Sequence, residues 1–155
     1  MTLSPDPGRR IRMKDVLPTR RFVQALVYPM LDDRTVLRER GEARHLVWTP
    51  EQNRDGWSLF LGHPVTQVED RPYASAARRE DLSGLPPAWI GVGAIDLFHD
   101  EDVEYARRLR EAGVEVELVV VDGMPHASDY LQWVPSMRDF RDSLRAALGR
   151  AVGSR

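Results

Sequence analysis

The amino-acid sequence predicts an α/β fold with a parallel sheet, on the basis of three observations. Three apolar segments have the character of buried strands, at residues 22–28, 88–94 and 114–121. Segments with helical spacing separate these strands, and such alternation is typical of right-handed βαβ units. An acid follows the second strand and a histidine follows the third. In open α/β sheets, functional sites lie at the carboxyl ends of the strands.

Length and composition favour a single domain and exclude several classes of protein. The chain has 155 residues, enough for one hydrophobic core, and its net charge of −2 gives no overall attraction to nucleic acid. It contains no cysteine, which excludes disulfides, thiolate zinc sites and a cysteine nucleophile. No apolar run approaches the ~20 residues of a membrane span, and the N-terminus lacks the apolar segment of a secretory signal. We therefore expect a cytoplasmic protein without a cofactor, a nucleic-acid partner or a membrane partner.

The N-terminal segment at residues 1–20 differs in composition from the rest of the chain. It is rich in turn-forming residues and carries a basic cluster between positions 9 and 14. This composition predicts a disordered, solvated extension, and an arm that binds an acidic partner is the alternative. The domain is expected over residues 21–155, and its first strand runs from Phe22 to Tyr28 and ends at Pro29.

The middle of the chain predicts helices that flank the sheet. Residues 31–48 are charged without a clear period, which indicates a long loop with room for short helices. Thr49, Pro50 and Gln52 form the signature of a capped helix start, and Gly62 marks its end. A further short helix is expected within residues 74–79.

The C-terminal part predicts two more helices around the third strand. Residues 101–112 have helical spacing, and Gly113 ends that helix. The third strand alternates in its first half, which is typical of a sheet edge with one wetter face. Ser136 is expected to cap the last helix, at residues 137–148, and the predicted buried stripe consists of Met137, Phe140, Leu144 and Leu148.

Several motifs, taken in order between Phe22 and Leu148, resemble the C-terminal half of the hormone-sensitive-lipase-like branch of the α/β-hydrolases. They are Ala25-Leu26-Val27-Tyr28-Pro29, Leu85-Pro86-Pro87-Ala88, Asp96-Leu97-Phe98-His99-Asp100-Glu101, Tyr105-Ala106, Ala112-Gly113-Val114 and Gly123-x-x-His126. The resemblance implies a partial α/β-hydrolase fold, in which a parallel sheet of the three C-terminal strands has flanking helices.

The resemblance also implies roles for individual residues. Asp96 corresponds to the acid of a catalytic triad and His126 to its general base. Asp100 and Glu101 correspond to supporting residues at the start of the following helix. In a full-length parent, the implied reaction is hydrolysis of a small carboxylic ester through a serine acyl-enzyme.

The chain departs from the family's pattern at single residues and by an absence. Leu97 replaces the usual proline, which should be mild, and Ala127 follows the histidine where glycine is common, which should alter the loop locally. The sequence contains neither the His-Gly-Gly-Gly oxyanion loop nor the Gly-x-Ser-x-Gly nucleophile elbow that the family carries. Ser58 follows Gly-Trp but lacks the second glycine and lies on the predicted helix, and Ser83 follows no strand.

Without a nucleophile, an acid–base pair has nothing to activate except water, so the chain alone is expected to be inactive. Two classes of function remain open. The chain is the C-terminal half of an ester hydrolase, as a truncated product or one part of a split enzyme, or it is a pseudo-hydrolase that keeps the fold for binding. The strand from Phe22 to Tyr28 would lack one neighbour, which predicts self-association or an N-terminal-half partner.

Two further groups of residues have a functional and a structural interpretation. One set could be read as a metal site: His99, Asp100, Asp102, Asp122 and His126. Its spacing matches no compact ligand set, and acids at positions 100–102 are explained by the dipole at a helix N-terminus. The sequence leaves two interpretations open for Trp48, Trp57 and Phe60: they line an acyl or alcohol pocket, or they pack in the core or an interface.

Overall fold

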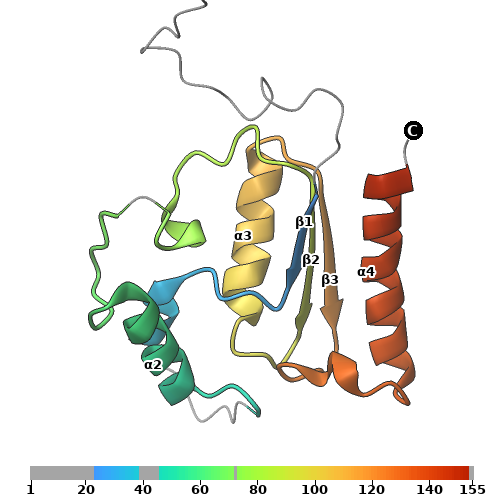
Figure 1. The fold of residues 1–155 in the computed structure, drawn as a ribbon, viewed down its shortest axis with the longest axis horizontal. Coiled ribbons are helices and arrows are strands. Elements are labelled where there is room, and N and C mark those ends of the chain that lie inside the picture. Colours follow the sequence, from blue (N-terminus) through green and yellow to red (C-terminus); the bar gives the residue numbers. More distant parts are fainter. Residues whose placement is uncertain (1–22, 39–45, 72, 154–155) are drawn as a thin grey trace, which may run out of the picture.

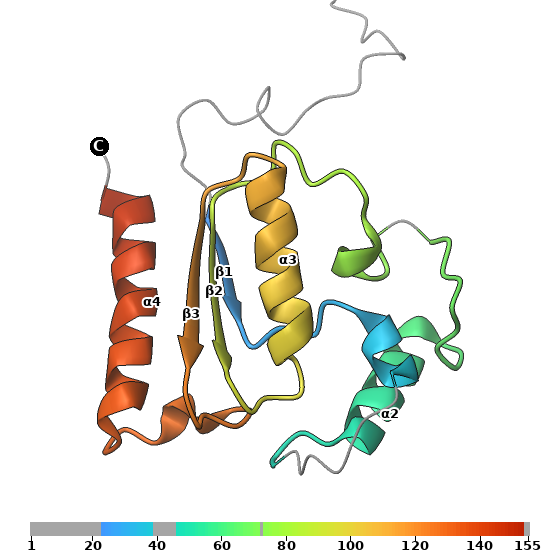
Figure 2. The same cartoon turned by 180° about the vertical axis from the view of Figure 1, so that it is seen from behind.

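The chain folds into three layers, with a parallel sheet between two helices (Figure 1). The computed structural model describes residues 23–38, 46–71 and 73–153. The expected tail at 1–20 and the first residue of the predicted strand, Phe22, lie outside these ranges. Helix α3 (His99–Glu111) covers one face of the sheet, and α4 (Pro135–Gly153) covers the other. Seen from behind, helix α2 (Pro50–Leu61) lies beyond α3, on the face of the sheet opposite to α4 (Figure 2).

The sheet consists of three strands: β1 (Gln24–Val27), β2 (Ala88–Gly93) and β3 (Val116–Val121). They are parallel and lie in the order β1-β2-β3. Ala88 pairs with Gln24 on one side and with Val116 on the other, so the strands start level. The expected parallel sheet with its third strand at an edge is therefore confirmed. All three carboxyl ends lie at one edge, the lower edge in Figure 1.

Alternating side chains of β2 build a separate core on each face of the sheet. Ala88 and Ile90 are buried in the core that contains α3. Trp89 points to the opposite face, where its ring packs edge-on against Phe140 of α4 at a centroid distance of 5.3 Å. A Cβ at Gly91 would lie 2.2 Å from the Trp89 ring and 2.5 Å from the Phe140 ring. Glycine at this position lets α4 approach the sheet closely.

The helices on the α3 side begin and end close to their predicted positions. Thr49 and Gln52 form both hydrogen bonds of the capping box of α2, and Gly62 ends this helix in the left-handed conformation. Helix α3 begins at His99, two residues before its predicted start, because residues 99–100 already adopt helical geometry. Two short 3-10 helices lie where short helices were expected: η1 (Asp33–Leu37) and η2 (Ala76–Arg78).

Helix α4 differs from the prediction in its start and in its buried stripe. It begins at Pro135, so Ser136 lies inside the first turn and is not the N-cap residue. Leu148 is 41% exposed, whereas Ala147 is buried against the sheet. From Met137 the buried positions follow at steps of three, four and three residues, which end at Ala147. A step of four from Leu144 leads instead to Leu148 and rotates this side chain toward solvent. The other members of the predicted stripe do pack there: Met137, Phe140 and Leu144.

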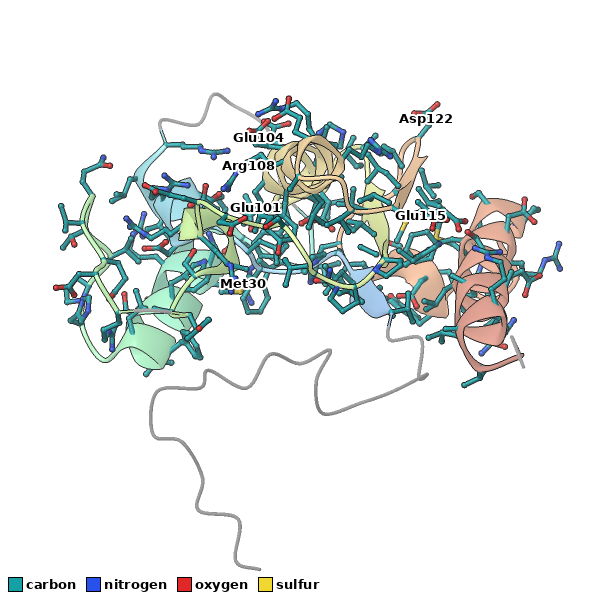
Figure 3. All side chains as sticks on the ribbon, turned by 90° about the horizontal axis from the view of Figure 1, so that it is seen from above. Met30, Glu101, Glu104, Arg108, Glu115 and Asp122 are labelled. Atoms are coloured by element: carbon teal, nitrogen blue, oxygen red, sulfur yellow. The ribbon has the colours of Figure 1, made fainter. Side chains whose placement is uncertain are left out.

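The polar surface of α3 faces the segments that follow β1. Seen from above, Glu101, Glu104 and Arg108 lie on the side of α3 that faces η1 and η2 (Figure 3). Tyr105 lines the cavity on this same side, and Ala106 and Leu109 are buried in the core beneath the helix. Within the described ranges, no helix is both long and apolar enough to cross a membrane.

Candidate active site

The loops after β2 and β3 lie against each other at the carboxyl edge of the sheet. Ala94 donates a backbone hydrogen bond to Val121 at 2.9 Å, so the loops start side by side. Gly93 makes this approach possible, because a Cβ there would lie only 1.8 Å from the carbonyl oxygen of Met124. The two loops carry the acid and the histidine that the sequence singled out. Their proximity follows from the parallel pairing of neighbouring strands.

Asp96 and His126 form a hydrogen-bonded pair across these loops. Nδ1 of His126 lies 3.0 Å from Oδ2 of Asp96 and 3.3 Å from Oδ1. The Asp96 side chain is fully buried and the His126 side chain is 14% exposed. Asp96 also accepts a hydrogen bond from the backbone N–H of Phe98 at 3.0 Å, which fixes its carboxylate. The expected contact between the two side chains is present, and it engages Nδ1 of the imidazole.

Three aromatic rings surround the imidazole of His126. Tyr28 approaches it edge-on at a centroid distance of 4.6 Å, and Phe98 does so at 5.4 Å. Trp48 lies 5.8 Å away in a tilted arrangement. Neither Tyr28 nor Phe98 was predicted to lie beside the histidine. Tyr28 directly follows β1 and Phe98 closely follows Asp96. These positions place both residues at the carboxyl edge of the sheet, which was the signal in the sequence that could have predicted their contact with His126.

The start of α3 is tied to the chain after β1 by Glu101. Its carboxylate accepts hydrogen bonds from the backbone N–H groups of Leu31, at 2.7 Å, and Asp32, at 3.1 Å. The hydroxyl of Thr35 donates to the other carboxylate oxygen. Burial raises the pKa of Glu101 to about 7, although these hydrogen bonds favour the ionised form. Asp100, by contrast, has its side chain 84% exposed and contacts the ring of the adjacent His99.

Asp102 is a buried acid, which the sequence explained by the dipole at the helix N-terminus. Its side chain is completely buried, and neither carboxylate oxygen has a hydrogen-bond partner among the residues that the structure describes. Burial raises the pKa of Asp102 to about 10, and the carboxylates of Glu101 and Asp96 add to the shift. Asp102 is therefore protonated at neutral pH. A neutral carboxyl at this position adds no negative charge beside the Asp96–His126 pair.

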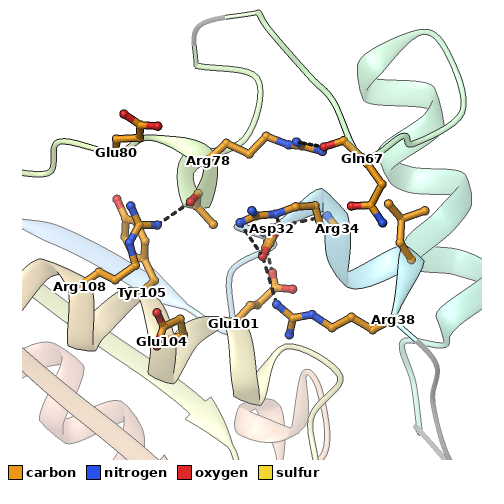
Figure 4. Close-up of a pocket in the computed structure, with 12 residues that line it drawn as sticks. Asp32, Arg34, Arg38, Gln67, Arg78, Glu80, Glu101, Glu104, Tyr105 and Arg108 are labelled. Atoms are coloured by element: carbon orange, nitrogen blue, oxygen red, sulfur yellow. Dashed lines mark hydrogen bonds and ion pairs between the residues drawn. The ribbon is translucent and has the colours of Figure 1, made fainter.

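A cavity of about 580 Å³ lies between α3, η1 and η2 and does not include the Asp96–His126 pair. Four arginine side chains surround it, each already bound to protein oxygens: Arg34 and Arg38 to Asp32, Arg78 to the carbonyl of Gln67, and Arg108 to the carbonyl of Ala77 (Figure 4). The charged side chains around this cavity connect η1 and η2 with α3. We assign it no part in the chemistry of the pair.

The remaining candidate residues are scattered. Trp57 is buried in the inner face of α2, whereas Phe60 beside it is 67% exposed. Trp48 alone of the three predicted pocket residues contacts His126. Among the described residues, no group of three histidine or acidic side chains is arranged to hold a metal ion. Ser58 lies on α2, as predicted, and not at a turn between a strand and a helix.

Comparisons with known proteins identify similar sequences. A family model described as "alpha/beta hydrolase fold" matches residues 11–129. Carboxylesterase NlhH of Mycobacterium tuberculosis is 39% identical over 109 residues, which are 66% of this chain and 34% of that protein. Ethyl acetate hydrolase of Pseudomonas putida is 30% identical over 112 residues, 67% of this chain and 32% of that protein. The chain spans about a third of the length of these relatives.

Solved structures agree with the architecture. The structure titled "Bacterial Heroin Esterase" superposes with a TM-score of 0.72 and 28% identity, over 84% of this chain and 42% of that chain. Esterase LipW from Mycobacterium marinum superposes with a TM-score of 0.67 and 29% identity, over 83% of this chain and 40% of that chain. Each alignment covers most of this chain and less than half of the solved one.

Proposed function

Because the chain belongs to the α/β-hydrolase fold family, in its hormone-sensitive-lipase-like branch, we propose that Asp96 and His126 are the acid and the general base of a serine carboxylesterase. The observation that carries the proposal is the 3.0 Å contact between Nδ1 of His126 and the buried carboxylate of Asp96. An acid that orients a histidine in this way is the arrangement that serine hydrolases use. The substrate class is a small carboxylic ester, which the names of similar proteins support.

In this reaction His126 takes the proton of a serine hydroxyl at Nε2 while the oxygen attacks the ester carbonyl. Asp96 keeps the other ring proton on Nδ1 and stabilises the imidazolium that forms. His126 then gives its proton to the leaving alcohol, and the same steps with water release the acid. Glu101 supports the site by fixing the start of α3, because the loop that carries Asp96 leads directly into this helix. Asp100 has no such contact and remains a candidate only through its position in the motif.

The nucleophile and the oxyanion donors come from outside the printed sequence, which has no Gly-x-Ser-x-Gly segment. An N-terminal half of the fold would supply them, in a longer chain or in a second polypeptide. The site therefore depends on bringing His126 and an external serine together. Catalysis requires both within hydrogen-bond reach, with the oxyanion donors facing the developing charge.

Strand β1 supports a second candidate function, which is binding. The N–H groups of Gln24 and Tyr28 donate toward β2, to the carbonyls of Pro87 and Gly91. The N–H groups of alternate residues such as Ala25 therefore point away from β2, where the described part of the chain has no further strand. Such an edge is a template for strand pairing. Its occupant would be an N-terminal-half strand or β1 of a second copy.

A complementation experiment tests the enzymatic proposal. The N-terminal part of Carboxylesterase NlhH, up to the start of the similar segment, is fused to this chain, and hydrolysis of p-nitrophenyl acetate is measured. We expect turnover from the fusion and none from the chain alone above a His126→Ala control. Turnover by the chain alone that is lost in His126→Ala and trapped by a serine-directed phosphonate would overturn the proposal of an external nucleophile. A folded fusion without turnover would count against the catalytic role itself and favour the binding function.

A further inference from the structure

Tyr28 and Asp129 connect the end of β1 with the loop that follows His126. The hydroxyl of Tyr28 donates a hydrogen bond to Oδ1 of Asp129 at 2.8 Å, across a separation of 101 residues in the sequence. The carbonyl oxygen of Asp129 accepts a hydrogen bond from the guanidinium of Arg141 on α4. We propose that Tyr28 and Asp129 are positioning residues that hold the imidazole of His126 in the orientation needed by a general base.

The backbone at this contact supports the proposal. Tyr28 has a φ of 36° and Ala127, directly after His126, has a φ of 55°. Residues with a side chain rarely adopt this left-handed region, and where they do the surrounding structure holds them there, often at functional sites. The bend at Tyr28 brings its ring to 4.6 Å from the His126 ring, edge to face. The bend at Ala127 leads the chain into η3 (Ser128–Tyr130), which carries Asp129.

The contact acts through the ring of His126. A general base needs a free lone pair on Nε2, which requires that the proton sit on Nδ1. Asp96 favours that form only while Nδ1 stays within reach of its carboxylate, at the observed 3.0 Å. If the loop shifts, the ring leaves Asp96 and its proton exchanges between both nitrogens. Burial and the bond to Asp129 raise the pKa of the Tyr28 hydroxyl, so this group remains a hydrogen-bond donor.

The inference rests on the proposed role of His126, but its test needs no ester hydrolysis. The 155-residue chain is labelled with ¹⁵N-histidine, and long-range ¹H–¹⁵N spectra report which ring nitrogen of neutral His126 carries the proton. We expect Tyr28→Phe and Asp129→Ala each to raise the ratio of the Nε2–H to the Nδ1–H form about tenfold, which corresponds to ~1.4 kcal/mol of lost preference. The double variant should show no further change, and Asp129→Asn, which keeps an acceptor oxygen, should stay close to the original ratio.

Matched controls separate positioning from general destabilisation. Tyr130→Phe removes a hydroxyl from the exposed tyrosine of the same loop, and Asp122→Ala removes an exposed acid. Both should leave the ratio unchanged. A lower melting temperature of Tyr28→Phe with an unchanged ratio would overturn the proposal and leave a purely structural contact. If Tyr28→Phe fails to fold, Asp129→Ala decides, since it keeps the Tyr28 ring. A shifted ratio in a fusion without turnover would uphold this inference and reject the proposed catalysis.

Discussion

Glu101 of α3 accepts a hydrogen bond from the backbone N–H of Leu31 at 2.7 Å, and this contact joins the helix after Asp96 to the chain after β1. The same oxygen accepts from the N–H of Asp32, and both N–H groups belong to buried residues. Buried backbone donors without a partner are costly. Glu101 therefore fixes the start of α3 relative to the chain after β1.

The first prediction concerns this contact. Glu101→Ala should lower the free energy of unfolding by about 2–4 kcal/mol, because it leaves two buried backbone donors, the N–H groups of Leu31 and Asp32, unpaired. Glu101→Gln keeps an acceptor oxygen and should cost less than about 1 kcal/mol at neutral pH. Glu104→Ala, at an exposed position of α3, is the control and should change stability by less than about 0.5 kcal/mol. Urea denaturation followed by circular dichroism measures all three. Equal losses for the alanine and glutamine variants of Glu101 would contradict the account.

The second prediction concerns the pH dependence caused by Asp102. The pKa of its carboxyl is about 10 in the fold, against an ordinary value of 3.8. Between these pH values the folded chain holds a proton that the unfolded chain has released, so stability falls as pH rises. Asp102→Asn stays neutral and should remove this slope, with a gain of about 2–4 kcal/mol at pH 7.

Denaturation of the wild type, Asp102→Asn and Asp100→Asn at pH 5, 7 and 9 measures the slope. Asp100→Asn serves as the matched control, because Asp100 is exposed, and it should leave the dependence of stability on pH unchanged. Glu101 contributes its own slope to every variant, so the difference between Asp102→Asn and the wild type isolates Asp102. Parallel curves for these two proteins would show that Asp102 ionises normally in the fold.

The third prediction concerns the residue after the histidine. Ala127 adopts the left-handed region, with φ 55° and ψ 27°, where a Cβ is unfavourable. Ala127→Gly should therefore raise the free energy of unfolding by about 0.5–1 kcal/mol. Ala146→Gly, at an exposed position of α4, should have the opposite effect and destabilise by a similar amount. Thermal melts of the two variants provide the comparison, and destabilisation by both would argue against the left-handed backbone at Ala127.

The fourth prediction concerns the open edge of β1. We expect the chain to self-associate with rising concentration, because no strand of the described ranges pairs with β1 on the side away from β2. Ala25→Pro removes one outward donor and no bond to β2, so it should weaken association about tenfold or more while the fold persists. Leu26→Pro, which interrupts the pairing with β2, should instead unfold the strand. A wild-type chain that sediments as a monomer at high concentration, with a sharp cooperative melt, would refute this edge as the contact.

The contact between Asp96 and His126 could be predicted because it depends on topology. Both residues directly follow neighbouring parallel strands, so the sheet itself brings them together. The bond between Tyr28 and Asp129 could not, since it depends on a left-handed tyrosine that no pattern in the sequence indicates. The topology of the sheet brings residues near each other, and unusual backbone conformations such as the positive φ of Tyr28 then decide which side chains are in contact.

The start of α3 shows a second limit of the sequence. Asp100 and Glu101 are adjacent acids with the same helix-dipole explanation, yet one faces solvent and the other is buried. The rotation of the helix about its axis decides between them, and tertiary packing sets that rotation. For the same reason, the predicted stripe of α4 was correct at Phe140 and wrong at Leu148, where packing selects Ala147 instead.

The most direct test of the central claim compares two histidines at the same sheet edge in the completed enzyme. His126→Ala and His99→Ala are introduced into the fusion with the N-terminal part of the mycobacterial relative, and kcat/KM for p-nitrophenyl acetate is measured. His99 contacts the exposed carboxylate of Asp100 and is the matched control. We expect a loss of at least ~10³-fold for His126→Ala and less than about a twofold change for His99→Ala. Retention of activity in a folded His126→Ala fusion would contradict the claim that the Asp96–His126 pair is the acid–base half of an esterase site.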